Sequence, residues 1–197
     1  MKSLKILCSI LLLSIFAAPK IIAQISIEDQ IKIAVLAAPE EYRADATVFG
    51  YNDDGLLYKI KEGNNQFYCI ADNQKDPAFQ VSCYHESLEL FMKRGRELRA
   101  EGKTPQEIFD IREEEAKKGS LQMPAKPATM NIYFGTDVSY NAEKGIMDGA
   151  QFRYVIYVPF ETQESTGLPL KPNGQGHPWL MDAGTHKAHI MIIPKAN

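Results

Sequence analysis

A pair of cysteines constrains the fold of this chain more than any other feature of its sequence. Cys69 and Cys83 stand in two stretches, residues 66–72 and 78–85, that read as β-strands joined by a short connection. If these strands pair antiparallel, the two cysteines can lie opposite each other, at the separation that a disulfide spans. We therefore predict a disulfide between Cys69 and Cys83, which would fix the pairing of the strands; two free buried thiols are the alternative.

The first residues of the chain indicate the oxidising compartment that such a disulfide needs. Lys2 and Lys5 precede residues 6–18, which are almost wholly apolar. That run has the length of the apolar part of a signal peptide and is too short to cross a bilayer as a helix. We expect a signal peptide at residues 1–23, cleaved after Ala23. The protein would then be periplasmic or secreted, without a retained membrane anchor.

The chain that remains, residues 24–197, suits one domain with a hydrophobic core of its own. The whole sequence carries 22 basic and 25 acidic residues. Removal of the signal peptide takes away three lysines and no acid, which leaves 19 basic residues against 25 acidic ones and a formal charge of −6. The two signs are interspersed and no basic block is present, so we expect no nucleic-acid partner and no attraction to anionic membranes.

The N-terminal half reads as a short helix followed by strands. Ser26 can cap an amphipathic helix that ends at Pro39, and we expect this helix to pack on the body of the protein. Polar turns then separate several short β-like stretches. We expect a β-meander, in which each strand pairs with the next, at residues 46–51, 56–61, 66–72 and 78–85.

Two helices follow, and together they predict an αα-hairpin. The first, residues 86–100, carries an apolar stripe that includes Gly95, where another backbone could approach closely. The second starts with a capping box between Thr104 and Glu107. Its charged run at residues 112–118 places acids before bases, which is typical of a solvent-exposed face.

The C-terminal third supplies the remaining strands. Residues 150–160 are the strongest candidate, with apolar and aromatic side chains on both faces, and we expect this strand to be central. A polar excursion at residues 137–149 precedes it, and a long polar loop at residues 161–176 follows it; loops of this length are often functional. The other expected strands are residues 129–134, 179–181 and 188–193.

Taken together, these elements predict an α+β fold. We expect a mainly antiparallel sheet, made of an N-terminal β-meander and C-terminal strands, with an αα-hairpin and a short N-terminal helix.

Three of the four histidines gather after the long loop. The polar group that spans thirteen residues there consists of His177, Asp182, His186 and His189. Imidazole and carboxylate are ligands for zinc and similar ions, but the spacing fits no known zinc motif. On a strand, His186 and His189 would also point to opposite faces. We therefore expect no metal and no cofactor, and interpret these residues, with Trp179, as a candidate binding surface.

The single tryptophan offers a second interpretation of this region. Trp179 could join Tyr154 and Tyr157 of the strong strand in an aromatic platform for a sugar or a peptide. Aromatic residues also fill protein cores, and packing in the core is the role that we expect for Trp179.

Several stretches along the chain resemble a family of uncharacterised exported bacterial proteins. They are residues 59–69, 83–85, 94–102, 176–181 and 189–194. The resemblance spans most of the chain after the signal peptide. It implies no activity, no cofactor and no catalytic residue.

Two functional hypotheses follow. The first is a non-catalytic binding or interaction domain, because a small exported domain with a long loop beside an aromatic strand carries no recognisable catalytic set. Its partner would be a small molecule, a glycan or a peptide. The alternative is a metal-dependent hydrolase that uses the C-terminal histidines and Asp182, which requires at least three of these side chains to converge. The sequence does not decide whether the protein is an enzyme.

Overall fold

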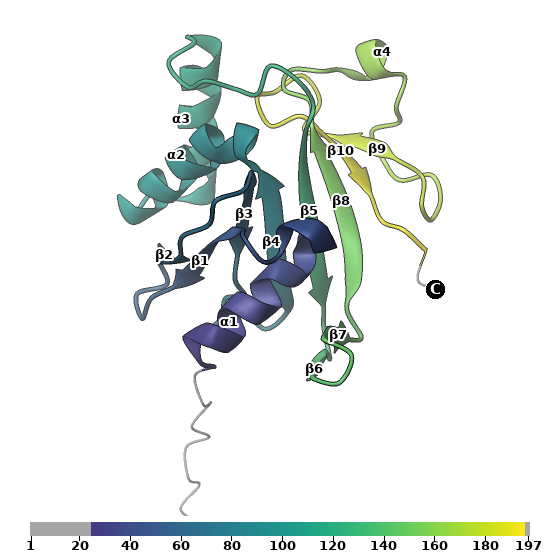
Figure 1. Ribbon diagram of the computed structural model, residues 1–197. Helices are drawn as coiled ribbons and strands as arrows, with labels where there is room; N and C mark the ends of the chain where they lie inside the picture. Colours follow the sequence, from purple (N-terminus) through teal and green to yellow (C-terminus); the bar gives the residue numbers. More distant parts are fainter. Residues whose placement is uncertain (1–24, 196–197) are drawn as a thin grey trace, which may run out of the picture.

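The computed structural model describes residues 25–195, so the expected signal peptide at residues 1–23 lies outside the described residues. Within the described part, eight strands form one sheet and two more form a separate hairpin (Figure 1). The strands of the sheet are β1 (Thr47–Tyr51), β2 (Leu57–Lys61), β3 (Phe67–Ile70), β4 (Phe79–His85), β5 (Ala128–Gly135), β8 (Gln151–Tyr157), β9 (Trp179–Met181) and β10 (His189–Ile192). The hairpin consists of β6 (Ser139–Asn141) and β7 (Ile146–Asp148).

The helices lie on both sides of this sheet. They are α1 (Ile27–Ala34), α2 (Glu89–Ala100), α3 (Pro105–Lys117) and the short α4 (Gln163–Thr166). Single 3-10 turns occur at Val35–Ala37, Glu40–Tyr42 and Glu86–Leu88. In Figure 1, α1 crosses in front of the sheet, while α2 and α3 pack side by side. None of the helices between residues 25 and 195 is long and apolar enough to cross a bilayer.

The strand order of the sheet is β2-β1-β3-β4-β5-β8-β10-β9, which confirms an α+β fold with a mainly antiparallel sheet. The predicted N-terminal β-meander is wrong in one respect. Strand β1 lies between β2 and β3, and it pairs in parallel with β3, with Val48 beside Cys69. The physical reason is burial: β1 is buried along almost its whole length, whereas β2 carries Lys59 and Lys61 and takes the edge.

The disulfide lies in the core beneath α1. Cys69 and Cys83 face each other across the antiparallel pair of β3 and β4, and they form the predicted disulfide. Neither cysteine is exposed to solvent. They pack with Ala34 of α1 and with Val48 and Val81 of the sheet, so the N-terminal helix packs on the body as expected.

The opposite face of the sheet packs against α2, which forms the predicted αα-hairpin with α3. The capping box is also confirmed, because Thr104 and Glu107 exchange hydrogen bonds between side chain and backbone at the start of α3. Tyr84, the neighbour of Cys83 in β4, points to this second face and packs with Phe91 of α2 and Tyr157 of β8. The sheet therefore has a core on each side.

Two segments that the sequence presented as polar loops contain regular structure. The excursion at residues 137–149 forms the hairpin of β6 and β7, where Asn141 donates a side-chain hydrogen bond to Asp148 at 2.8 Å. Met147 is buried in this hairpin, and the Tyr133 hydroxyl donates to its carbonyl at 2.9 Å. The long loop at residues 161–176 contains α4, which Thr162 caps.

Candidate functional site

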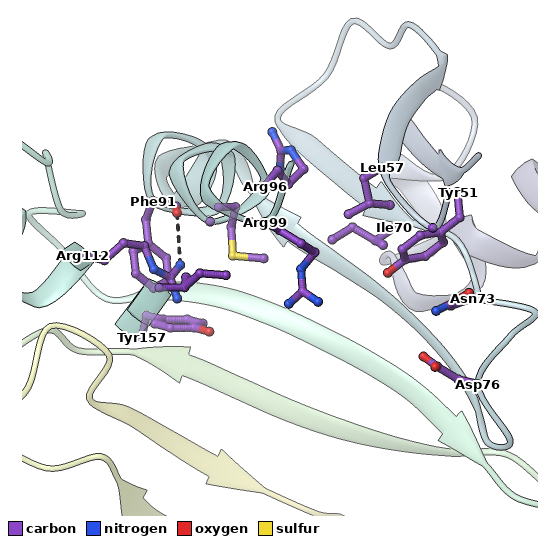
Figure 2. Close-up of a pocket in the computed structure, with 14 residues that line it drawn as sticks. Tyr51, Leu57, Ile70, Asn73, Asp76, Phe91, Arg96, Arg99, Arg112 and Tyr157 are labelled. Carbon is purple, nitrogen blue, oxygen red and sulfur yellow. Dashed lines mark hydrogen bonds between the residues drawn. The ribbon is translucent and has the colours of Figure 1, made fainter. Parts of the chain in front are cut away.

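A cleft opens between the helix pair and the second face of the sheet (Figure 2). It consists of two adjoining cavities of about 450 and about 460 Å³, which share several lining residues. We call it the arginine cleft; its main lining residues are Tyr51, Ile70, Asp76, Arg99, Arg112 and Tyr157. Strands β1, β3 and β8 supply one wall, and α2 and α3 supply the other, so elements from both ends of the chain build the site.

Arg112 is held in the wall of the cleft by its neighbours on α2. A Cβ atom at position 95 would lie 3.0 Å from the Arg112 Nη1 atom, so Gly95 makes room for the guanidinium. The expected close approach at Gly95 is therefore made by a side chain and not by a backbone. The Arg112 Cζ atom lies 4.0 Å from the centre of the Phe91 ring, and Nη1 donates to the Phe91 carbonyl at 3.3 Å.

Two arginines of the cleft pair with no carboxylate in the part of the chain that the structure describes. On the same helix pair, Arg94 pairs with Glu115 at 2.7 Å and Arg96 pairs with Glu89 at 2.5 Å. Arg99 and Arg112 have no acidic oxygen within 4.0 Å among residues 25–195, and the buried Nε atom of Arg112 has no hydrogen-bond partner there. An anion bound in the cleft would supply the oxygen acceptors that these two guanidinium groups lack.

The electrostatics of the cleft agree with this interpretation. Burial and the nearby charge of Arg99 lower the pKa of Arg112 below its ordinary value. Burial raises the pKa of Tyr157 to about 12, and burial also raises that of Tyr51. Both tyrosines therefore keep their hydroxyl protons at neutral pH and can donate hydrogen bonds to an anion. Figure 2 shows Tyr157 next to Arg112, with Arg99 reaching into the space between these residues and Tyr51.

His186, from the predicted histidine group, is buried next to this cleft. Its ring is fully inaccessible to solvent and packs in T-shaped arrangements with the Phe91 and Phe109 rings. The Glu113 carboxylate of α3 lies 2.6 Å from His186 Nδ1 and accepts a hydrogen bond from the His186 backbone N at 2.7 Å. Glu113 also pairs with Lys117 at 2.6 Å. This contact fastens α3 to the turn between β9 and β10.

The pKa values of Glu113 and His186 are both lower than their ordinary values. Burial opposes the charge on Glu113, but hydrogen bonds from Lys117 and His186 outweigh it and lower the pKa of Glu113 to about 2. Burial lowers the pKa of His186 more than the bond to Glu113 raises it. At neutral pH the pair is thus an anionic carboxylate beside a neutral imidazole whose Nδ1 carries the proton. The buried Nε2 of His186 has no hydrogen-bond partner among the described residues.

The remaining polar members of that group lie in separate environments. His189 is buried in β10, where its Nδ1 lies 2.8 Å from the Lys187 carbonyl. Asp182 forms an ion pair with the Lys187 ammonium at 3.2 Å, and His177 is exposed in the loop before β9. Between residues 25 and 195, no three His, Cys, Asp or Glu side chains gather where a metal ion could bind. Lys187 is the residue of this stretch that lines the cleft.

Trp179 takes the core position that we expected. It is partly buried and packs against the core beneath α2. The aromatic platform of Trp179, Tyr154 and Tyr157 is wrong, because the two tyrosines lie on opposite faces of β8. Tyr157 is in the core under α2, whereas Tyr154 stacks on Phe152 on the face of α1. Strand β10 also separates β8 from β9.

The sequence interpretation missed the arginines of the cleft. It assigned residues 112–118 to a solvent-exposed face, which is right for Glu114, Lys117 and Lys118 but wrong for Arg112. A signal for its burial was present: Arg112 follows the buried Ile108 by four residues, so both project from the same side of α3.

Comparison of the chain with protein-family models, with curated proteins and with solved structures found no match. The functional argument therefore depends on the geometry of the cleft.

Proposed function

We propose that the protein is an exported, non-catalytic binding protein that holds a small anionic molecule in the arginine cleft. The observation that carries the proposal is the pair Arg99 and Arg112, two guanidinium groups that line one cavity without a carboxylate partner among the described residues. Guanidinium groups bind carboxylates and phosphates through charge-assisted hydrogen bonds, often two at a time.

The size and lining of the cleft support a small molecule. A volume of about 450 Å³ falls within the range of small-molecule sites, which is roughly 300–1,000 Å³. The lining combines apolar side chains, such as Ile70 and Met92, with a few charged and hydroxyl groups. Such sites use the apolar surface for affinity and the polar groups to orient the ligand.

Export is the second part of the proposal. The disulfide between Cys69 and Cys83 supports it, because disulfides persist in the periplasm and outside the cell and are rare in the cytosol. The apolar run at residues 6–18 supplies the expected signal for export. The ligand would therefore be encountered in the periplasm or outside the cell.

Calorimetric titration of the full chain with small anions tests the binding proposal. The probes are hexanoate and hexyl phosphate, with hexanamide as the uncharged control of the same length. We expect at least one anion to bind and hexanamide not to bind. Arg99→Gln should weaken binding roughly tenfold or more, since it removes a charge-assisted contact at the cleft.

A matched variant separates the cleft from general charge effects. Lys93→Gln removes the same charge from α2 at an exposed position outside the cleft, and it should leave the affinity unchanged. Equal losses in Arg99→Gln and Lys93→Gln, or the absence of binding by either anion, would contradict the proposal.

A further inference from the structure

The arginine cleft also has an acidic end. The connection between β3 and β4 contributes Asp72, Asn73 and Asp76 to its lining. Figure 2 shows Arg99 on one side of the open space and Asp76 with Asn73 on the other. Arg99 and Asp76 line the same cavity, yet no ion pair joins them within 4.0 Å among residues 25–195. Opposite charges thus face one space without neutralising each other.

The two aspartates differ in how far the protein already uses them. Asp72 accepts hydrogen bonds on both oxygens, from Gln80 N at 2.8 Å and from Gln74 Nε2 at 2.9 Å. Asp76 is exposed, and its carboxylate accepts no hydrogen bond from the described residues. Asp76 is therefore the acid that remains available to a ligand.

The surface between the two charged ends is apolar. Ile70, Met130 and Ile132 project from β3 and β5 and line the part of the cleft that Asp76 and Arg99 share. A ligand that crosses this surface places hydrocarbon against it, and its ends meet charges of opposite sign. A molecule with an anion alone would leave Asp76 without a counter-charge.

We propose that the cleft binds a small amino-carboxylate, whose carboxylate contacts Arg99 and Arg112 and whose ammonium group contacts Asp76. Amino acids and short peptides share this chemistry. The inference rests on the proposed function, because it assigns the anionic end of the ligand to the same arginines. It adds a positive charge to the proposed ligand and specifies how the ligand lies in the cleft.

Matched pairs of probes test the added charge. The full chain is titrated with ω-amino-carboxylates from glycine to 8-aminooctanoate, and with the alkanoate of the same length in each case. At one chain length or more, we expect the amino-carboxylate to bind at least roughly tenfold more tightly than its alkanoate. Asp76→Asn should abolish this excess, because it removes the partner of the ammonium group, whereas Arg99→Gln should weaken both probes.

The control is Asp110→Asn, which makes the same change at an exposed position of α3 outside the cleft and should preserve the excess. If alkanoates bind and no amino-carboxylate binds more tightly, the inference is wrong and the proposed function stands. If the excess survives in Asp76→Asn, the assignment of the ammonium group is wrong. If neither class of probe binds, both proposals are wrong.

Discussion

At the scale of single residues, the contact between Glu113 and His186 shows how a buried polar group is retained. The imidazole is fully buried and packs against two phenylalanine rings, and one carboxylate bonds to both its Nδ1 and its backbone N. A donor that is buried without a partner costs about 1–3 kcal/mol, and the hydrogen bonds to the carboxylate remove this cost for His186. The contact joins residues that are 73 positions apart in the chain.

Glu113→Gln should therefore lower the free energy of unfolding by about 2 kcal/mol, because two hydrogen bonds to a charged acceptor become bonds to a neutral one. Urea denaturation at pH 7 measures the change. Glu114→Gln, at the exposed neighbouring position, breaks only an ion pair with Lys118 and should give no measurable change. A Glu113 variant as stable as the Glu114 variant would count against the role of this contact.

Single residues also mark the limit of the sequence interpretation. The pairing of Cys69 with Cys83 was predictable, because compartment and strand pattern both pointed to it. The role of Arg112 was not, since its charge is read as a surface feature unless the packing of Gly95 and Phe91 beneath it is known. Whether a charge has a partner is a property of the fold and not of local sequence.

At the scale of elements, features that depend on residues close in sequence were predicted correctly, whereas the place of β1 in the sheet was not. The capping box of α3 and the limits of β9 depend on residues close in sequence, and both were predicted correctly. The place of β1 between β2 and β3 depends on which strand buries more surface in the finished sheet. The alternation of apolar and polar residues along each strand does not show which strand buries more surface in the sheet.

The disulfide between β3 and β4 should contribute to stability through the loop that it closes. Its two cysteines are 14 residues apart, and closing a loop of about that length is worth about 3 kcal/mol. We expect the double variant Cys69→Ala, Cys83→Ala to lose this amount in urea denaturation. Added reductant should destabilise the original protein and leave the variant unaffected; an equal response of both proteins to reductant would contradict this assignment.

At the scale of the whole molecule, the histidines that looked like a single site lie in separate surroundings. His186 fastens α3 to the turn before β10, and His189 packs in the core beside Tyr157. Only Lys187, between them, lines the cleft. These histidines are close in sequence, but the turn and the strand place their side chains in different surroundings. The spacing alone could not show this.

The burial of these histidines predicts how global stability depends on pH. Burial lowers the pKa of both His186 and His189 below 6.5, so the unfolded chain takes up protons first as the pH falls. The free energy of unfolding should therefore be nearly constant between pH 8 and pH 7 and should decrease below about pH 6.5. The charges of Arg112 and Lys187, which also lower the pKa of His186, act in the same direction.

Below about pH 4.5, Glu113 should add to the loss, because its pKa of about 2 lies under its ordinary value and the unfolded chain is protonated first. Urea denaturation at pH 8, 7, 6, 5 and 4 gives the profile. His177→Gln, at the exposed histidine, should have the same profile as the original protein. Stability that stays constant down to pH 5 would show that the buried histidines do not control it.

The two edge strands of the sheet affect how readily copies of this chain associate. Strands β2 and β9 each have one edge with no neighbouring strand among the described residues. The edge at β2 carries Lys59 and Lys61, and β9 is only three residues long. Charged and very short edge strands oppose the addition of a further strand. At high protein concentration, the sheet is thereby protected against joining edge to edge into aggregates.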